Sequence, residues 1–285
     1  LEKWGDFGKG WQVEKSYVAM TAPYYFPISG TPKAWTGGTN GPISGEVTLL
    51  AIEKDEDFKK FEGKIAGKIV LVKSTANTSP TFEADASRMT DKELEELAKQ
   101  PMGASHRYSP EVIARYLERR AFGRKVDEFL KNENAKLVIR GRSGKHGTYF
   151  TSNGASYDVD AVPAIAELET EPEHADLMAR LLENGIPVKV EADIKTSFAT
   201  DPASYNVIAE IPGTDKDLKA ELVMLGGHLD SWHSATGATD NAAGCTVMME
   251  AVRILQTAGL KPRRTIRIAL WSGEEQGLHG SRNYV

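Results

Sequence analysis

Hydrophobic positions along the first two thirds of the chain form short runs separated by turns and charged stretches. Runs such as Ile69–Val72 are rich in β-branched residues and predict buried strands, whereas apolar residues at helical spacing predict amphipathic helices. Strands that alternate with helices in this way predict a compact α/β unit. The expected strands are residues 46–52, 67–73, 137–140 and 188–192, with a short apolar run at 162–165, and the expected helices are 90–99, 110–132 and 172–184.

The pattern changes near Asp201. Residues 205–211 alternate as a strand, 221–226 predict a central buried strand, 241–256 an apolar-rich helix and 264–271 a second buried strand. A strand–helix–strand order of this kind is typical of a parallel, doubly wound sheet. The fold class expected for the chain is therefore α/β, with two units that differ in their pattern of hydrophobic and polar residues.

Composition narrows the class of protein further. The 285 residues are 40% hydrophobic and 26% charged, as in an ordinary globular protein, and the single cysteine excludes an internal disulfide. Lys and Arg number 35 against 40 Asp and Glu, and the net charge of −5 argues against nucleic acid as the main partner. No apolar run approaches the roughly 20 residues of a membrane span. The chain begins Leu1-Glu2-Lys3-Trp4, which predicts a processed or trimmed protein.

Ionisable residues follow both buried strands of the second unit. His228 and Asp230 come after the first, and Glu274 and Glu275 after the second, with Asp240 at the expected start of the intervening helix. Ligands of parallel sheets bind beyond the carboxyl ends of the strands. An imidazole suits zinc, a carboxylate can bridge two ions, and of two adjacent carboxylates one can bind metal while the other accepts a proton from water.

Each of these features also has a plain structural interpretation. His228-Leu229-Asp230 can be a hydrogen-bonded loop, Asp240 can be a helix N-cap, and Glu274-Glu275 can be two solvated charges. Their shared position at strand ends and a helix start favours a common site over three independent coincidences.

Three runs in this region carry a family resemblance. His228-Leu229-Asp230-Ser231, residues 236–244 (TGATDNAAG) and residues 271–281 (WSGEEQGLHGS) together resemble the M28 family of co-catalytic zinc peptidases, in particular its plasma glutamate carboxypeptidase-like branch. Residues 63–72 and 161–165 are similar to the protease-associated domain that many members carry. The resemblance implies a lead-in segment of the catalytic domain at 1–45, a protease-associated domain at 46–200 and the N-terminal portion of the catalytic domain at 201–285.

The resemblance also implies a role for each site residue. His228 would bind one zinc ion, Glu275 the other, and Asp240 would bridge both. Glu274 would be the general base that acts on the attacking water, and Asp230 would orient His228. The peptide bond Asp240–Asn241 is expected to be cis, as is typical of the family.

Two further ligands, an aspartate and a histidine, are expected from residues after Val285 in members of the family. His233 and His279 are interpreted as loop and structural residues rather than substitutes. The 285 residues alone are therefore expected to bind metal weakly or not at all and to be inactive as a fragment.

The function predicted from these residues is a zinc-dependent exopeptidase that hydrolyses peptides or dipeptides with two Zn²⁺ ions. Whether it acts as an aminopeptidase, carboxypeptidase or dipeptidase stays open, as does its oligomeric state. The alternative is a catalytically inactive, receptor-like binding module of the same architecture, against which the joint presence of His228, Asp240, Glu274 and Glu275 argues. The resemblance implies a secreted, periplasmic or lysosomal location.

Several other motifs give weaker evidence for a functional site. Residues 141–145 (GRSGK) lack the spacing of a phosphate-binding P-loop, and Cys245 is expected to be a small buried helix residue. Asn77-Thr78-Ser79 matches a glycosylation sequon. The arginines of 110–132 are expected on a solvated face, because acidic residues interleave with them; a basic helix for membrane or nucleic acid is the disfavoured alternative.

Overall fold

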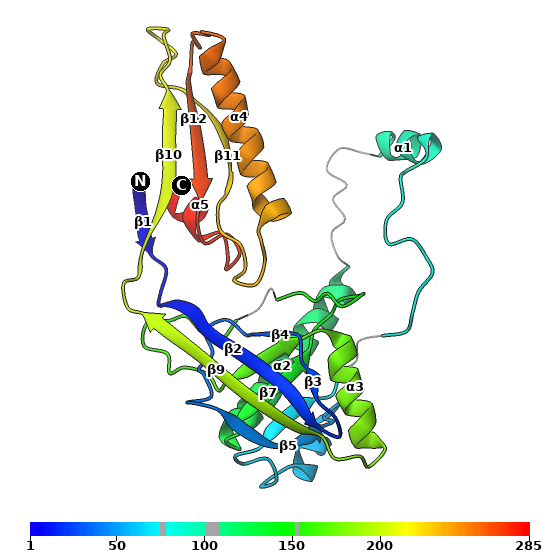
Figure 1. Cartoon of the computed structure of the whole chain (residues 1–285). Coiled ribbons are helices and arrows are strands. Elements are labelled where there is room, and N and C mark those ends of the chain that lie inside the picture. The colour runs from blue at the N-terminus through cyan, green and yellow to red at the C-terminus, as the bar shows by residue number, and fades with distance from the viewer. Residues whose placement is uncertain (75–77, 101–108, 152–153) are drawn as a thin grey trace.

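The computed structural model describes residues 1–74, 78–100, 109–151 and 154–285, so Asn77 of the sequon lies outside the described residues. The described strands form two mixed sheets, one of eight strands and one of four, which are joined through the N-terminal strands and the connection from β9 to β10 (Figure 1). This arrangement confirms the predicted α/β class.

The eight-stranded sheet has a parallel centre covered by a helix on each face. Its order is β3-β2-β9-β5-β6-β7-β8-β4, with β5 to β8 parallel to one another. Its strands are β2 (Gly10–Ala22), β3 (Phe26–Pro27), β4 (Gly30–Pro32), β5 (Ile43–Leu50), β6 (Ile69–Val72), β7 (Leu137–Gly141), β8 (Glu167–Thr170) and β9 (Lys189–Ala199). The helices that precede, cover or follow them are η1 (Asp55–Lys60), α1 (Asp91–Ala98), α2 (Pro110–Asn132) and α3 (Pro172–Glu183).

Alternation along β6 and β7 explains why both strands are continuously apolar. Val70 and Val138 pack with the C-terminal half of α2, whereas their neighbours in sequence form the core on the side of α3. Strands of a parallel sheet that are buried on both faces need an apolar residue at every position. The predicted strands at 67–73 and 137–140 are thereby confirmed.

Strand β8 is the element that the hydrophobic pattern missed. The apolar run at 162–165 contributes only an isolated bridge from Ala164 to Thr36, and the strand itself is the polar stretch Glu167–Thr170. Glu167 and Glu169 are nevertheless buried, and they form ion pairs at 2.9 and 3.1 Å with Arg140 of the neighbouring strand β7 and with Arg142, which follows β7. In this strand, charge pairing of the two glutamates accompanies the burial of the apolar Leu168 in the core.

The four-stranded sheet has the order β1-β10-β12-β11, in which β11 and β12 are parallel. Helix α4 lies against these two strands (Figure 1). The elements of this unit are β1 (Glu2–Asp6), β10 (Ala203–Ile211), β11 (Leu222–His228), η2 (Ala238–Ala243), α4 (Gly244–Thr257), β12 (Thr265–Trp271) and α5 (His279–Tyr284).

The expectation that residues 221–226 form a central buried strand is wrong in position. Residues 222–228 do form β11, but β11 is the edge strand of this sheet, and Leu222, Val223 and Met224 are 41–45% exposed. Among the described strands only β12 pairs with it, and α4 covers one face. The central strand is β12, with Ala269 fully buried.

The N-terminal segment contributes to both sheets. β1 pairs antiparallel with β10 in the four-stranded sheet, while β2, β3 and β4 belong to the eight-stranded sheet. The strands of the expected lead-in segment 1–45 are thus shared between the two units, and the domain division at residues 45 and 200 stays a prediction.

An aromatic cluster joins the two units. Phe7, which follows β1, stacks on Tyr157 with ring centroids 4.7 Å apart, and Tyr157 donates or accepts a 3.0 Å hydrogen bond with His279 of α5. Trp35 packs against Tyr157 on one side and Trp232 on the other. His279 is therefore a packing residue, as expected. Within the residues described, none of the helices is both long and apolar enough to cross a membrane.

Candidate metal centre

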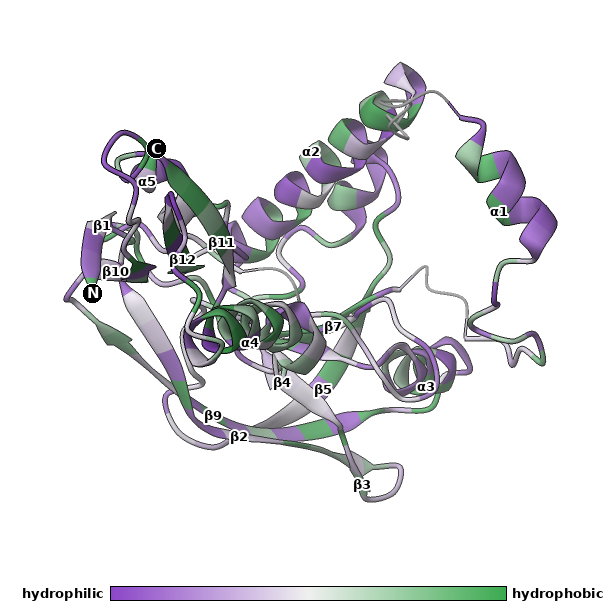
Figure 2. Cartoon of the chain, turned by 90° about the horizontal axis from the view of Figure 1, so that it is seen from above, coloured by the Kyte–Doolittle hydropathy of each residue, from purple (hydrophilic) through white to green (hydrophobic). Residues whose placement is uncertain are grey.

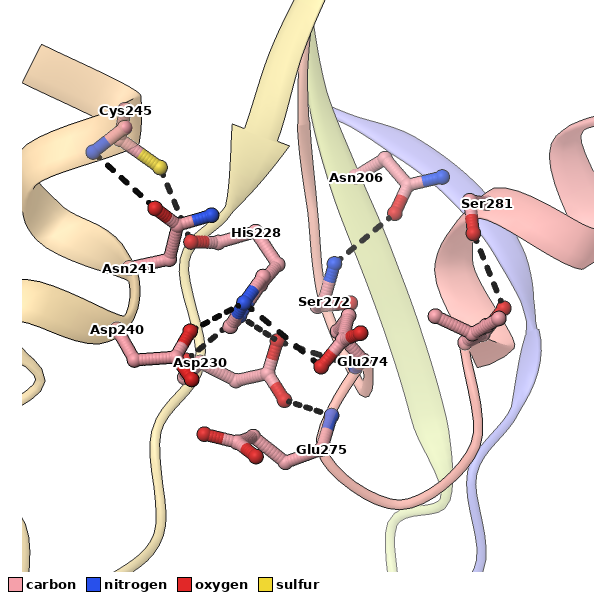
Figure 3. Close-up of polar contacts among 12 residues, drawn as sticks. Asn206, His228, Asp230, Asp240, Asn241, Cys245, Ser272, Glu274, Glu275 and Ser281 are labelled. Atoms are coloured by element: carbon pink, nitrogen blue, oxygen red, sulfur yellow. Dashed lines mark hydrogen bonds and ion pairs between the residues drawn. The ribbon is translucent and has the colours of Figure 1, made fainter. Parts of the chain in front are cut away.

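The candidate site lies at the carboxyl ends of β11 and β12. His228 is the last residue of β11 and pairs in register with Trp271, the last residue of β12. The chain after Trp271 turns back to carry Glu274 and Glu275 beside the imidazole (Figure 3). The predicted meeting of the two strand ends is confirmed, in keeping with the general position of ligand sites in open parallel sheets.

The ligand atoms of His228, Asp240 and Glu275 all lie within 4.8 Å of one another. His228 Nε2 is 2.9 Å from Asp240 Oδ1 and 3.7 Å from Glu274 Oε2. One imidazole with two carboxylates is a donor set that suits zinc, and a third carboxylate beside it is placed to exchange protons with a water. The residues present therefore fit a divalent metal ion.

The tautomer of His228 is set by Asp230, but through the main chain. His228 Nδ1 lies 3.0 Å from the Asp230 carbonyl oxygen, to which it donates, and 3.6 Å from the Asp230 carboxylate. A proton held on Nδ1 leaves the Nε2 lone pair facing the carboxylates, where a metal ligand is needed. The expected orienting contact exists, and its acceptor is the carbonyl group rather than the side chain.

The Asp230 side chain instead holds the loop that carries the two glutamates. Its Oδ1 accepts a hydrogen bond from the Glu274 amide and its Oδ2 one from the Glu275 amide, both at 3.1 Å (Figure 3). A carboxylate that accepts two backbone N–H groups is a strong, charge-assisted anchor. Asp230 thus positions His228 and both glutamates at once.

Asp240 projects into the site because its neighbour takes over the capping role. Asp240 has non-helical torsion angles, φ −116° and ψ 94°, and the peptide bond to Asn241 is cis, as expected. Asn241 Oδ1 accepts a hydrogen bond from the Gly244 amide at the start of α4. The Asp240 carboxylate caps no helix, so the alternative of a simple N-cap does not describe it.

The electrostatics of the site reflect an excess of carboxylates. Burial works to lower the pKa of His228, but the hydrogen bond to the Asp230 carbonyl and the surrounding carboxylates outweigh burial and raise that pKa above its usual value. Burial, and next the charge of Asp240, raise the pKa of Glu275, while His228 acts in the opposite direction. A bound cation would offset this concentration of negative charge.

Two residues support the candidate site through contacts that the sequence did not predict. Buried Asn206 on β10 donates to the Gly280 carbonyl at 2.9 Å and accepts from the Ser272 amide at 3.3 Å, so it ties together both ends of the loop with the glutamates. Cys245, buried as expected, donates its thiol hydrogen to the His228 carbonyl at 3.0 Å. Asn206 is a polar residue inside the predicted strand 205–211, and this feature of the sequence could have identified it.

His233 is close in sequence to the candidate site, but its ring contacts residues outside the site. His233 Nε2 donates to the Pro32 carbonyl at 2.8 Å, and burial lowers the pKa of His233. Its ring also packs edge-on against Trp11. The interpretation of His233 as a loop residue rather than a ligand agrees with these contacts.

Comparison with known proteins gives a family match for this unit. The family model described as Peptidase family M28 matches residues 206–285. Residues 206–285 are thus similar to peptidase family M28. The match covers β10 through α5 and includes all five predicted site residues of this M28 segment.

Curated relatives extend the similarity beyond that segment. Carboxypeptidase Q from Homo sapiens is 34% identical over 136 residues, 48% of this chain and 28% of the relative, and carboxypeptidase Q from Xenopus laevis is 33% identical over 136 residues, 48% of this chain and 29% of the relative. Leupeptin-inactivating enzyme 1 from Streptomyces exfoliatus is 37% identical over 92 residues, 32% of this chain and 20% of the relative. The chain spans less than a third of the length of these relatives.

Solved structures share the fold of the whole chain. The peptidase M28 precursor from Shewanella amazonensis superposes with a TM-score of 0.58 at 23% identity, over 97% of this chain and 55% of that one. A zinc aminopeptidase from Bacillus subtilis gives a TM-score of 0.51 at 17% identity, over 97% of this chain and 53% of that one. The M28 segment and the eight-stranded sheet therefore occur together in a known architecture.

Proposed function

We propose that this chain supplies metal ligands and the general base of a zinc-dependent exopeptidase. The observation that carries the proposal is the convergence of His228, Asp240 and Glu275 within 4.8 Å, with Glu274 beside them. The relatives support the proposal, because the curated ones include carboxypeptidase Q and one solved structure is that of a zinc aminopeptidase. The substrate is a peptide or dipeptide, and the location is secreted, periplasmic or lysosomal, as the family resemblance implies.

In this proposal His228, Asp240 and Glu275 would hold the zinc, together with further ligands that this set lacks for a second ion. Bound zinc supplies Lewis acidity, which polarises the scissile carbonyl and makes a water more acidic. Glu274 accepts the proton of the attacking water and passes it to the leaving amine. Asp230 keeps the His228 Nε2 lone pair and both glutamates directed at the same point.

The test separates metal binding from proton transfer. In Glu274→Gln we expect zinc content to stay at the wild-type value while kcat for dipeptides falls by about 10²–10⁴-fold, because a general base contributes roughly that factor. In His228→Ala we expect zinc binding itself to weaken. Zinc content is measured by equilibrium dialysis followed by elemental analysis. Turnover is measured with dipeptide substrates. Both assays use the protein of which this chain is all or part.

Glu250→Gln is the matched control. Glu250 lies on α4 and pairs with Arg253 at 2.6 Å, away from the candidate ligands, so its variant should keep both zinc and turnover. Full activity in Glu274→Gln would remove this residue as the base. Absence of both zinc binding and turnover in the wild-type protein would overturn the enzyme proposal in favour of the receptor-like alternative.

A further inference from the structure

An arginine-rich groove lies in the eight-stranded unit, beneath the N-terminal half of α2. A cavity of about 850 Å³ is lined by Arg115, Tyr116, Arg119 and Arg120 of the helix and by Arg142, which follows β7. A second cavity of about 490 Å³ shares Arg119 and Arg142 with the first and adds Lys73 and Arg140. No acidic side chain of the described residues is among those that line either cavity.

The position of the groove follows from how α2 extends past its core. Val126 and Leu130 bury one face of the helix against the sheet, and the same face continues toward the N-terminus through Arg119 and Val112 at seven-residue spacing. Residues 110–121 are all exposed, and this end of the helix projects away from the sheets (Figure 2). The groove therefore opens where β6 and β7 end, which is the edge of a parallel sheet at which ligands bind.

The helix arginines carry charge that the described residues do not neutralise. Arg140 and Arg142 are ion-paired with Glu167 and Glu169, but no described carboxylate forms an ion pair with Arg115, Arg119 or Arg120. Guanidinium groups bind carboxylate and phosphate oxygens in a planar, two-point geometry. Three guanidinium groups on one groove, without an ion-pair partner in the described part of the chain, are thus suited to an oxyanion.

We propose that this groove binds a small ligand with two or more phosphate or carboxylate groups. Its volume falls in the range of small-molecule sites. The neighbouring cavity that shares Arg119 has a mixed lining, with acidic Glu53, Asp55 and Glu118 beside basic Lys54, Lys125 and Arg140, so the purely basic lining is confined to the groove. The net charge of −5 disfavours a long polyanion such as nucleic acid. The acidic residues interleaved along α2 in sequence therefore lie outside the groove rather than cancelling its charge.

Binding is tested on the full 285-residue chain after removal of metal with EDTA, so that the metal centre contributes nothing. The probes are inorganic phosphate, pyrophosphate and citrate, each compared with sodium chloride of equal ionic strength, by calorimetry and by thermal unfolding. We expect saturable binding of pyrophosphate or citrate that is tighter than that of phosphate, and the preferred probe separates a phosphate from a carboxylate ligand.

Two variants place the site. Arg115→Gln/Arg119→Gln should weaken binding by about tenfold or more, because charge-assisted hydrogen bonds are lost. Arg124→Gln removes an exposed arginine of the same helix that does not line the groove, and it should bind as the wild type does. Absence of saturable binding of all three probes, or an equal loss in both variants, would overturn the proposal.

Discussion

Among single residues, Asp230 connects three parts of the candidate metal centre. Its carbonyl fixes the tautomer of His228, and its carboxylate accepts the amides of Glu274 and Glu275. Sequence alone indicated a contact between Asp230 and the imidazole, because the two residues are separated by one position after a strand. It could not indicate the two amide bonds, since these join segments more than 40 residues apart and depend on how the loop after β12 turns.

Asp230→Asn tests this anchoring role. An asparagine has one carbonyl oxygen, so it can accept only one of the two amides and directs its NH₂ group at the other. We expect a loss of about 2 kcal/mol in the free energy of unfolding, as for a lost hydrogen bond to a charged group, and faster hydrogen exchange at both glutamate amides. Exchange is followed by mass spectrometry. Asp217→Asn, an exposed aspartate near β11, should change neither quantity, and unchanged exchange in Asp230→Asn would contradict the anchor.

At the scale of elements, apolar strands and capped helices were predictable and the polar strand was not. The helix at 110–132 has the predicted bounds, and the helix expected at 90–99 is present as α1, where Thr90 and Glu93 form a capping box. These features rest on local periodicity and on contacts three residues apart. β8 escaped prediction because its two buried glutamates pair with arginines of and just after β7, a non-local pairing that hydrophobic pattern does not encode.

The buried Glu169 of β8 should make the stability of this unit depend on pH. Burial, opposed by Arg142 and reinforced by Glu167, raises the pKa of Glu169 to about 7, above its ordinary 4.5. The folded state then holds a proton that the unfolded state releases, so stability falls as pH rises from 4.5 through 7, by roughly 3 kcal/mol in all.

Urea unfolding of wild type and Glu169→Gln at pH 5 and pH 8 measures this contribution. Between pH 5 and pH 8 the free energy of unfolding of the wild type should fall by about 3 kcal/mol more than that of Glu169→Gln, because glutamine cannot titrate. Glu62→Gln is a control in the same unit, since Glu62 is exposed to solvent. An equal loss in wild type and Glu169→Gln would show that Glu169 ionises at its ordinary pKa.

For the whole molecule, the N-terminal segment and the aromatic cluster connect the two sheets. β1 enters the M28 sheet, Phe7 reaches Tyr157, and β2 continues into the eight-stranded sheet. The family resemblance predicted two units but not this sharing of strands, because β1 pairs with β10, a strand far away in the sequence, and local pattern does not indicate such a partner. Through contacts of Tyr157 with His279 and of Trp35 with Trp232, this connection holds the eight-stranded unit next to the loops of the candidate metal centre.

Tyr157→Ala should loosen that connection. The change removes a stacked ring from Phe7, a packing surface for Trp35 and the hydrogen bond with His279, and a partly buried aromatic contact of this kind contributes about 2 kcal/mol. We expect the two units to unfold in separate transitions by calorimetry and the radius of gyration in small-angle scattering to increase. Tyr157→Phe, which keeps the ring and loses only the hydroxyl, should stay close to wild type, and Tyr116→Ala, an exposed ring on α2, should have no effect on either measurement. A single unchanged transition in Tyr157→Ala would mean that the N-terminal strands alone hold the units together.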